Sequence, residues 1–263
     1  MSVLDLDNLS VTVWGFDLLK NISLKLNTGE VMAIIGPNGA GKTSLINTLV
    51  NNGHSQQVNS GEVMLCGRAY NQWEAKQRAK HVALLPQLNS LAFPFVVEEV
   101  IGLGRIPHDT GCEVDTLIVD ESLRALDILH LKNRLYTQLS GGEKQRIQLA
   151  RVMVQVWRAE DAGERLLLLD EPTSSLDLGH QQQLMEVIRK FADQGVAILM
   201  VVHDINLVST YADKVLALCC GEVFAQGEPK TVINSELMKQ LYTVDVDIIK
   251  HPKTHQPLVM LGR

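Results

Sequence analysis

The residues from Gly36 to Thr43 carry the clearest chemistry in this sequence. They fill every position of the pattern G-x-x-x-x-G-K-[ST]. Glycines let the backbone turn so tightly that successive N–H groups face one anion, and a helix N-terminus adds partial positive charge. In such a loop the amine of Lys42 reaches the β- and γ-phosphates of a nucleotide, and the Thr43 hydroxyl can bind Mg²⁺. The predicted ATP-binding residues are Gly36, Pro37, Asn38, Gly39, Ala40, Gly41, Lys42, Thr43 and Ser44.

Two acids follow an apolar run later in the chain. Leu166–Leu169 has the composition of a buried strand, and Asp170 and Glu171 come directly after it. Ligands of open α/β sheets bind beyond the carboxyl ends of the strands, so carboxylates there face such a site. We predict that Asp170 holds Mg²⁺ and that Glu171 polarises the attacking water as general base. Two acids that only cap a strand are the alternative.

Strands that alternate with helices must position these residues. The pattern predicts strands at 31–35, 166–169, 197–202 and 215–219, and helices at 43–50, 178–194 and 206–212. Such alternation implies an α/β fold with a parallel sheet covered on both faces. Residues 97–149 are mostly helical, so we expect one domain of residues 1–263 with a core of about 1–87 and 156–263 and a helical subdomain of about 88–155. The C-terminal tail is predicted to form a short helix and a hairpin.

The composition narrows the class of protein. The chain has 263 residues and a net charge of -6, which argues against a dedicated nucleic-acid binder, so we expect no nucleic-acid partner. Its four cysteines form no CxxC pair, which disfavours a zinc site and favours a reducing compartment. No apolar run approaches the roughly 18 residues of a membrane span, and the acidic start is unlike a signal peptide. We therefore expect any role at a membrane to depend on a partner.

Four further motifs follow in order and carry a family resemblance. Leu139–Arg146 reads Leu-Ser-Gly-Gly-Glu-Lys-Gln-Arg and resembles the signature motif of ABC transporter ATPases. Gln87 is similar to the glutamine of that family's Q-loop, Asp177 lies in a segment that resembles its D-loop, and His203 resembles its switch histidine. The resemblance covers nearly the whole chain. It implies a P-loop NTPase core with an antiparallel β subdomain and an inserted α-helical subdomain.

The resemblance also implies a site shared by two chains. In the family, the signature of one subunit closes over the γ-phosphate bound by the other, in a head-to-tail dimer with twofold symmetry. In this sequence the signature residues are Ser140, Gly141, Gly142 and Glu143. A Ser-Gly-Gly turn exposes backbone N–H groups that suit an anion, although the same residues also suit an ordinary helix cap.

Three more side chains complete the expected ATP site. Gln87 stands at the border of the core, where its amide can ligate Mg²⁺ when core and helical segment close and release it when they open. His203 follows an apolar strand and can donate to the γ-phosphate, a structural histidine being the alternative. Trp14 stands where the family usually has a tyrosine that stacks on adenine, and Phe16 is its competitor.

Short motifs resemble one branch of the family. Val100–His108 resembles ATPases of importers for iron siderophores, haem and vitamin B12, and 91–95 and 251–259 look closer to the haemin-import branch. The resemblance implies an ATP-hydrolysing motor for haemin uptake, peripheral on the cytoplasmic face of a bacterial inner membrane; siderophore or vitamin B12 import is the alternative. A second copy, a transmembrane permease dimer and, indirectly, a periplasmic binding protein are the implied partners. Phe93 and Phe95 would dock the permease, unless both rings are buried.

Other functions fit the sequence less well. Repair ABC ATPases carry long coiled-coil insertions and translation ABC ATPases carry two cassettes, whereas this chain has one cassette. Degenerate regulatory cassettes lose the lysine or the glutamate, and Lys42 and Glu171 are both present. Direct haem ligation is disfavoured because Pro252 and Pro257 break any helix that would pair His251 with a second histidine. Surface positions are expected for the scattered histidines, which are His54, His81, His108, His130, His180, His251 and His255.

Overall fold

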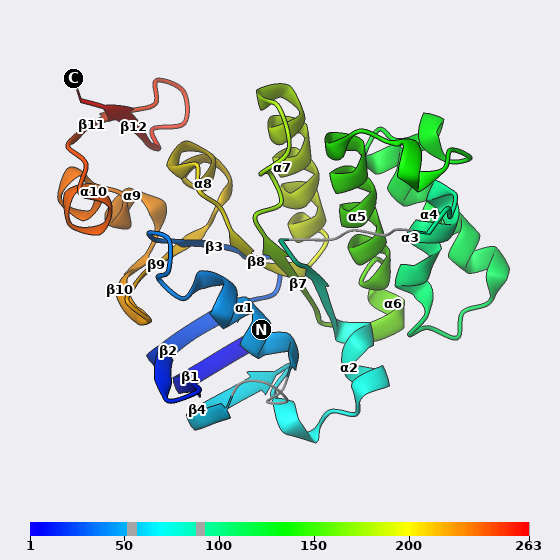
Figure 1. Cartoon of the computed structure of the whole chain (residues 1–263), viewed down its shortest axis with the longest axis horizontal. Helices are drawn as coiled ribbons and strands as arrows, with labels where there is room; N and C mark the ends of the chain where they lie inside the picture. Colours follow the sequence, from blue (N-terminus) through cyan, green and yellow to red (C-terminus); the bar gives the residue numbers. More distant parts are fainter. Residues whose placement is uncertain (52–56, 88–92, 263) are drawn as a thin grey trace.

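The computed structural model describes residues 1–51, 57–87 and 93–262, and its centre is a six-stranded sheet (Figure 1). The strands are β3 (Val31–Ile35), β6 (Val82–Leu85), β7 (Arg165–Asp170), β8 (Val196–Val201), β9 (Lys214–Cys219) and β10 (Glu222–Gly227). Their order is β10-β9-β3-β8-β7-β6, and all pairs are parallel except β10 with β9. The predicted parallel sheet is confirmed.

Apolar residues on both faces explain why the central strands form a buried sheet. Every residue of β3, β7 and β8 is buried, as expected for parallel strands covered on both sides. In β3, Met32 and Ile34 pack into one hydrophobic cluster, while Val31, Ala33 and Ile35 pack into another. The alternation follows the two-residue period of a strand, so the sheet separates two cores.

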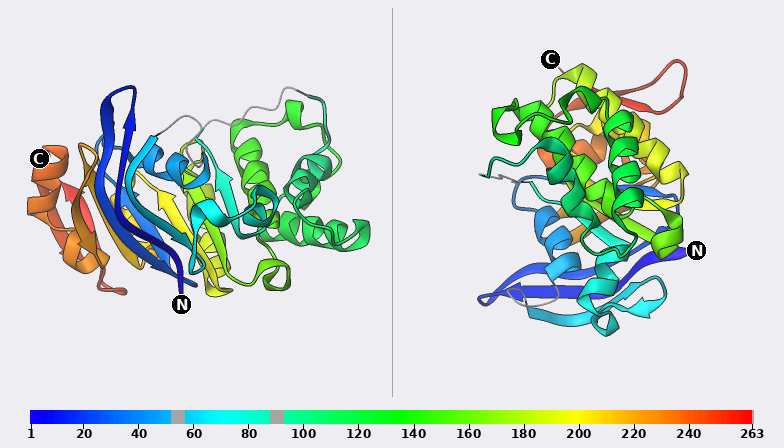
Figure 2. Two further views of the ribbon diagram at one scale, coloured as in Figure 1. Left: turned by 90° about the horizontal axis from the view of Figure 1, so that it is seen from below. Right: turned by 90° about the vertical axis from the view of Figure 1, so that its right-hand side faces the viewer.

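One of these cores lies under a second, antiparallel sheet. Its strands are β1 (Ser2–Val13), β2 (Phe16–Asn27), β4 (Gln57–Leu65) and β5 (Arg68–Ala69), in the order β2-β1-β4-β5. Helix α1 (Lys42–Asn51) contributes Leu45, Ile46 and Leu49 to the same cluster. Figure 2 shows this layer against the central sheet. The helix that follows the glycine loop is therefore held between two sheets.

Helices cover the other face of the central sheet. Helices α5 (Gly141–Gln155), α7 (Leu178–Asp193) and α8 (Ile205–Tyr211) pack on the sheet. Helices α3 (Val97–Gly102) and α4 (Cys112–Ala125) pack on α5, and the short α6 (Ala159–Ala162) follows α5 in the chain. Short 3₁₀ turns at Leu103–Arg105, Leu129–Leu131 and Tyr136–Gln138 connect the helices of the 97–155 segment. No helix in the described ranges is long and apolar enough to cross a membrane.

The C-terminal part confirms the predicted helix and hairpin. It comprises α9 (Pro229–Val232), α10 (Ser235–Tyr242), β11 (Val246–Lys250) and β12 (Pro257–Leu261). The hairpin packs on α8, where the amide of Asn206 pairs with the backbone of Val259. In Figure 1 it lies at the end of the molecule opposite α3 and α4.

Two local expectations need revision. The sequence pattern did not indicate α2 (Ala75–His81), a short helix without buried residues, and a 3₁₀ turn at Tyr70–Gln72 precedes it. The sequence pattern predicts a strand only at Glu62–Leu65, and the structure extends this strand back to Gln57 as β4; the first residues of β4 are mostly polar, so the pattern did not mark them. His54, Leu91, Ala92 and the expected subdomain border near residue 88 lie outside the described residues.

Arg105 anchors the helical segment through a buried hydrogen-bond cluster. Its side chain is 2% exposed; Nε donates to Asp115 at 2.8 Å, and Nη2 donates to Asp161 at 2.9 Å. Nη1 donates to the carbonyl oxygen of Val154 at 2.8 Å. Burial opposes ionisation of Asp115, but hydrogen bonds from Arg105 and Thr110 outweigh it and lower its pKa. Arg105 thus ties α4, α5 and α6 together.

The surface expectation is wrong for two histidines. His108 is 8% exposed, and its Nε2 lies 2.8 Å from the carbonyl oxygen of Gln155. Burial lowers the pKa of His108, so the neutral ring is favoured. His81 is half-buried, stacks on Trp73 at 4.6 Å and has Nδ1 2.8 Å from the oxygen of Glu164. Tertiary packing determines the burial of both rings, because neither histidine lies in a local apolar pattern of the sequence.

Replacing Arg105 tests the energetic weight of this cluster. Removing one partner of a buried ion pair leaves uncompensated charge and typically costs about 3–5 kcal/mol. We therefore expect Arg105→Ala to lower the free energy of unfolding by that amount in a chemical denaturation experiment. Arg158→Ala is the control, because Arg158 and Glu121 are 41% and 40% exposed and such pairs contribute about 0–1 kcal/mol. Equal losses in the two variants would contradict this assignment.

Candidate nucleotide site

The glycine loop connects β3 to α1 and has the backbone shape that a phosphate-binding loop needs. Gly36, Gly39 and Gly41 have positive φ angles of 148°, 79° and 100°. A Cβ at Gly36 would lie 2.2 Å from the carbonyl oxygen of Leu218, so no larger residue fits there. Left-handed glycines turn the loop, and the first N–H groups of α1 have no partner within the helix. The loop therefore offers donors to an anion.

Lys42 occupies the space inside this loop. It is 7% exposed, and its Nζ donates to the carbonyl oxygens of Gly36 at 2.7 Å and Pro37 at 2.9 Å. Burial lowers the pKa of Lys42, while the charges of Glu171 and Asp170 act to raise it. A polyanion in the loop would give this buried amine stronger acceptors than neutral carbonyl groups.

Asp170, at the end of β7, is the group best suited to a magnesium ion. It is 2% exposed, and its Oδ1 is buried with no hydrogen-bond partner. Burial raises the pKa of Asp170, and a hydrogen bond with Thr43 lowers it. Mg²⁺ prefers oxygen ligands and is commonly held by one or two carboxylates together with phosphates and water. An unpartnered carboxylate oxygen beside a hydroxyl therefore fits this ion.

Glu171 and His203 meet at the same edge of the sheet. The Nε2 of His203 lies 2.6 Å from Oε1 of Glu171. Glu171 has a φ of 54°, and its N–H donates to the oxygen of Val201 at 3.2 Å, which turns the chain at the end of β7. A left-handed glutamate is uncommon and is found where a site fixes the backbone. The ends of β7 and β8 thus bring these two side chains into contact.

The phosphate loop and Glu171 border one cavity of about 500 Å³, within the range of small-molecule sites, whereas Asp170 and His203 are not part of its described lining. Its described lining comprises Asp17, Leu18, Asn38, Gly39, Ala40, Gly41, Lys42, Thr43, Ser44, Gln87, Glu171, Cys220 and Gly221. Gln87 joins the phosphate loop although β6, which precedes it, is separated from β3 by two strands. Asp17, Leu18, Cys220 and Gly221 were not predicted, because no motif marks the start of β2 or the turn between β9 and β10.

Tyr242 is a further contact that the sequence did not indicate. Its hydroxyl accepts a hydrogen bond from the N–H of Gly36 at 2.9 Å, from the end of α10. Burial raises the pKa of Tyr242, so the phenol stays protonated at neutral pH. The C-terminal segment thereby touches the phosphate loop across 206 residues of sequence.

Trp14 and Phe16 stand at the tip of the β1–β2 hairpin. Trp14 is 91% exposed with a φ of 55°, and Phe16 is 76% exposed. Asp17, one residue further along, lines the cavity. Both rings are therefore free to stack on a base near this end of the cavity, and the choice between them stays a prediction.

The signature residues lie on another part of the molecule. Ser140 is the N-cap of α5 and forms a capping box, in which Glu143 accepts from the Ser140 N–H at 2.8 Å and Ser140 accepts from the Glu143 N–H at 3.3 Å. The helix-cap interpretation is thus realised, and it leaves the N–H groups of Gly141 and Gly142 without acceptors inside the helix. None of these residues is in the described lining of the cavity.

Asp177 caps the next helix, α7. Its Oδ1 accepts from the backbone N–H of His180 at 2.9 Å, and its Oδ2 lies 2.8 Å from the same residue's ring. The side chain is exposed and is not part of the described lining of the cavity. Within one chain Asp177 acts as a helix N-cap, so the predicted D-loop role of Asp177 requires a second molecule.

Fold and site together define a nucleotide-binding protein of the P-loop class. A buried strand, β3, leads through the glycine loop into a helix, and carboxylates lie at the end of β7, which is separated from β3 by β8 alone. Residues 19–174 match the family described as ABC transporter. The chain belongs to this family, which confirms the expected class of fold.

Curated relatives match over almost their whole length. The hemin import ATP-binding protein HmuV of Pseudomonas fluorescens Pf-5 is 43% identical over 258 residues, which cover 98% of this chain and 99% of the relative. The protein of the same name from Escherichia coli O157:H7 is 40% identical over 255 residues, covering 97% of each chain. Sequence identity of 40% or more over nearly the whole chain supports the same family membership.

Solved structures agree with the fold. One, of a transporter described as metal-chelate type in an inward-facing conformation, has a TM-score of 0.80 at 25% identity and covers 100% of this chain and 98% of that chain. A dimeric ATP-binding cassette bound to ADP and Pi has a TM-score of 0.73 at 24% identity and covers 86% and 98%. The second likeness concerns the fold alone.

Lys42→Ala tests the phosphate loop. Hydrogen bonds to charged groups contribute about 1.5–3 kcal/mol, so we expect ATP affinity to fall about ten- to a hundredfold in titration calorimetry. Lys20→Ala is the matched control, because Lys20 is a nearby exposed cation that pairs with Glu222 at 3.3 Å. Unchanged affinity in Lys42→Ala, or an equal loss in the control, would refute the role of Lys42.

Proposed function

We propose that this chain is the ATP-hydrolysing subunit of an ABC importer that drives haemin across the inner membrane. The observation that carries the proposal is the convergence of Lys42, Glu171 and the loop on one cavity, with His203 2.6 Å from Glu171. The cargo is supported by relatives that are named for hemin import and match almost the whole chain.

Binding begins with the phosphate loop. Its N–H groups and the start of α1 receive the phosphates, and Lys42 exchanges two carbonyl acceptors for phosphate oxygens. Asp170, Thr43 and Gln87 are the residues that would hold Mg²⁺. The ion would offset the negative charge of the phosphates. The protein itself contributes mainly positioning, because phosphoryl transfer needs little covalent help.

Glu171 and His203 prepare the attacking water. We assign Glu171 as the general base that draws the proton from this water, since its carboxylate borders the cavity next to the loop. His203 contacts Oε1 of Glu171 through Nε2 and reaches the same place from β8. It can hold the geometry of the water and donate to the γ-phosphate once a nucleotide separates the two side chains.

A second copy of the chain would complete the site. Ser140, Gly141, Gly142 and Glu143 form an exposed helix start that no nucleotide in the same chain's cavity contacts, and such a helix start suits a γ-phosphate held by another subunit. Asp177 at the start of α7 would lie at the same interface. Head-to-tail pairing with twofold symmetry brings each signature over the other loop.

The helical segment offers a surface for the permease. Phe93 and Phe95 are 66% and 39% exposed, with ring centroids 6.1 Å apart, so the interpretation that both are buried is excluded. A groove lined partly by Glu98 and Glu99 of α3 lies close by along the chain. Exposed aromatic rings beside a groove suit a short helix of a membrane partner. Such docking would hold the chain at the cytoplasmic face of the membrane.

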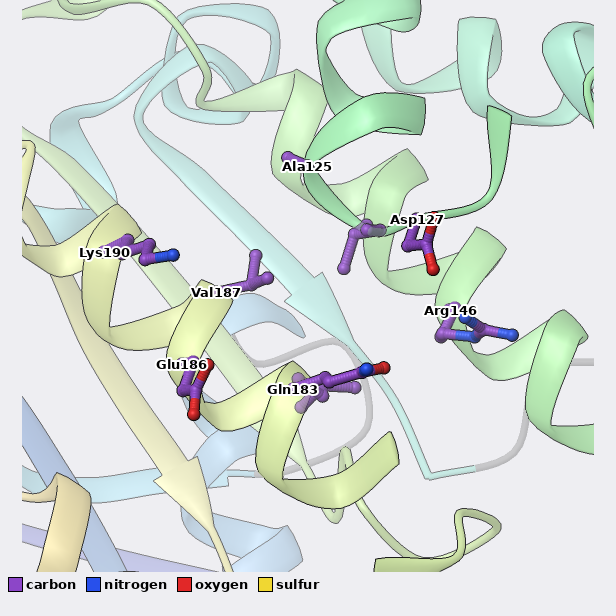
Figure 3. A pocket seen from close by; sticks show the side chains of 9 residues that line it. Ala125, Asp127, Arg146, Gln183, Glu186, Val187 and Lys190 are labelled. Carbon is purple, nitrogen blue, oxygen red and sulfur yellow. The ribbon is translucent and has the colours of Figure 1, made fainter. Parts of the chain in front are cut away.

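A second cavity supports movement between core and helical segment. It measures about 220 Å³ and lies between α7 and the ends of α4 and α5 (Figure 3). Gln183 and Val187 of α7 face Asp127 and Arg146 across it. Incomplete packing at this junction permits a rotation of the helical segment, proposed at about residues 88–155, against the core. Gln87 stands at the junction and lines the nucleotide cavity, so it would report nucleotide state to this movement.

A different cargo is the second candidate. The solved transporter with a TM-score of 0.80 is described as metal-chelate type. Iron siderophores and vitamin B12 are metal chelates, as is haem, so the same motor would serve any of them. The ATPase site is independent of this choice, because the cargo passes through the permease.

Glu171→Gln tests the general base. The amide keeps the shape of the side chain but accepts a proton far less readily. We expect the purified variant to bind ATP, to lose at least about a hundredfold in turnover, and to accumulate as a dimer in light scattering with ATP. Glu236→Gln, at an exposed position of α10, should retain turnover. Wild-type hydrolysis by Glu171→Gln would overturn the assignment.

A test of the cargo requires the chain assembled with its permease. We expect ATP hydrolysis by this chain with its permease in lipid to rise severalfold on addition of haem-loaded binding protein. Siderophore-loaded and cobalamin-loaded binding proteins should give no such rise. A rate of ATP hydrolysis that does not change on addition of the haem-loaded protein would refute haemin as cargo and leave the ATPase assignment intact.

A further inference from the structure

The second of two adjacent cysteines, Cys219 and Cys220, lies at the rim of the nucleotide cavity. Cys219 ends β9, and Cys220 with Gly221 forms the two-residue turn into β10. Both turn residues have positive φ, 51° and 80°, as a type I′ turn requires. Such turns favour Asn or Asp at the first position, so cysteine there is not explained by turn chemistry. Cys220 is exposed and lines the cavity.

Hydrogen bonds join this turn directly to the phosphate loop. The N–H of Gly221 donates to the carbonyl oxygen of Ala40 at 3.1 Å, and the carbonyl oxygen of Gly221 accepts from the N–H of Lys20 at 2.8 Å. A Cβ at Gly221 would lie 2.6 Å from the oxygen of Leu18, so the turn is packed closely against β2. The turn is therefore held against the loop, and a group added to Cys220 starts at the rim of the cavity.

The two thiols cannot readily form a disulfide with each other. Their Sγ atoms lie 3.8 Å apart, but the Cα atoms of adjacent residues are about 3.8 Å apart across a trans peptide. Unstrained disulfides need about 4.4–6.8 Å between Cα atoms. Burial raises the pKa of the half-buried Cys219, which makes it a poor attacking group. A mixed disulfide on Cys220 would therefore not be resolved by its neighbour.

We propose that Cys220 is a site of reversible S-thiolation by a low-molecular-mass disulfide of the glutathione type, and that the adduct blocks nucleotide binding. The inference rests on the nucleotide site proposed above. The Cys220 thiolate, after losing its proton to solvent, attacks one sulfur of the disulfide. A new S–S bond forms on Cys220, the original S–S bond breaks, and the released thiolate takes up a proton. A free thiol reverses the exchange.

The position of Cys220 accounts for both selectivity and effect. The carboxylates of a glutathionyl group carry the charge that the phosphate loop attracts, so the adduct occupies the space of the phosphates. The other cysteines differ: burial raises the pKa of Cys66 to about 12, and the exposed Cys112 lines a groove on the helical segment. Among the four cysteines, Cys220 alone is in the described lining of the nucleotide cavity. ATP use would thus stop when the thiol pool becomes oxidised.

The test uses the full chain and oxidised glutathione. Protein is treated, the modified residues are located by peptide mass spectrometry, and ATP affinity is measured by titration calorimetry before and after. We expect treated wild type to lose about tenfold or more in affinity and to recover it with dithiothreitol. Cys112→Ser, which keeps Cys220, should show the same loss. In Cys220→Ser, and in Cys220→Asn, which suits the left-handed turn, affinity after treatment should equal that variant's untreated value.

Protection by ATP gives a second readout. Bound ATP with Mg²⁺ should slow glutathionylation of Cys220 but leave the rate at Cys112 unchanged. Full modification of Cys220 with unchanged ATP affinity, or equal rates with and without ATP, would overturn the proposal. Untreated protein that binds no ATP would instead refute the proposed nucleotide site.

Discussion

The rest of the structure depends on the parallel pairing of β3, β8 and β7. Val201 pairs with Ile34 on one side and with Asp170 on the other, so the carboxyl ends of the three strands are level. The glycine loop, Glu171 and His203 consequently leave the sheet side by side. These strands are buried on both faces, which demands the antiparallel sheet and α1 on one side and helices on the other.

Two buried groups of the site, Lys42 and Asp170, carry opposite charges that the protein compensates only in part. Burial lowers the pKa of Lys42 and raises the pKa of Asp170, so each buried group lacks part of the compensation that its charge needs. Lys42 relies on two carbonyl oxygens, and Oδ1 of Asp170 has no partner. A nucleotide with its magnesium ion would bring an anion to the amine and a cation to the carboxylate. The site is therefore electrostatically matched to that pair.

Helix α5 connects the exposed signature to the nucleotide core. Ser140 caps its first turn, while Val154 and Gln155 near its end accept hydrogen bonds from Arg105 and contact His108. The amide of Gln155 also donates to the carbonyl oxygen of Val82 at 2.9 Å, at the start of the strand that leads to Gln87. The proposed displacement of the helical segment would reach β6 through this hydrogen bond.

Periodicity and contiguous motifs are local signals. The sequence alone therefore predicted the alternating strands and helices of the core, the phosphate loop, and the magnesium-binding or catalytic roles of Asp170, Glu171 and His203. Only the tertiary structure decided that Cys220 and Tyr242 adjoin the loop and that His108 is buried beside Gln155. Their contacts join segments far apart in the chain, so no local pattern encodes them. The packed sheet brings them together, because burying its apolar faces fixes where every connecting turn must lie.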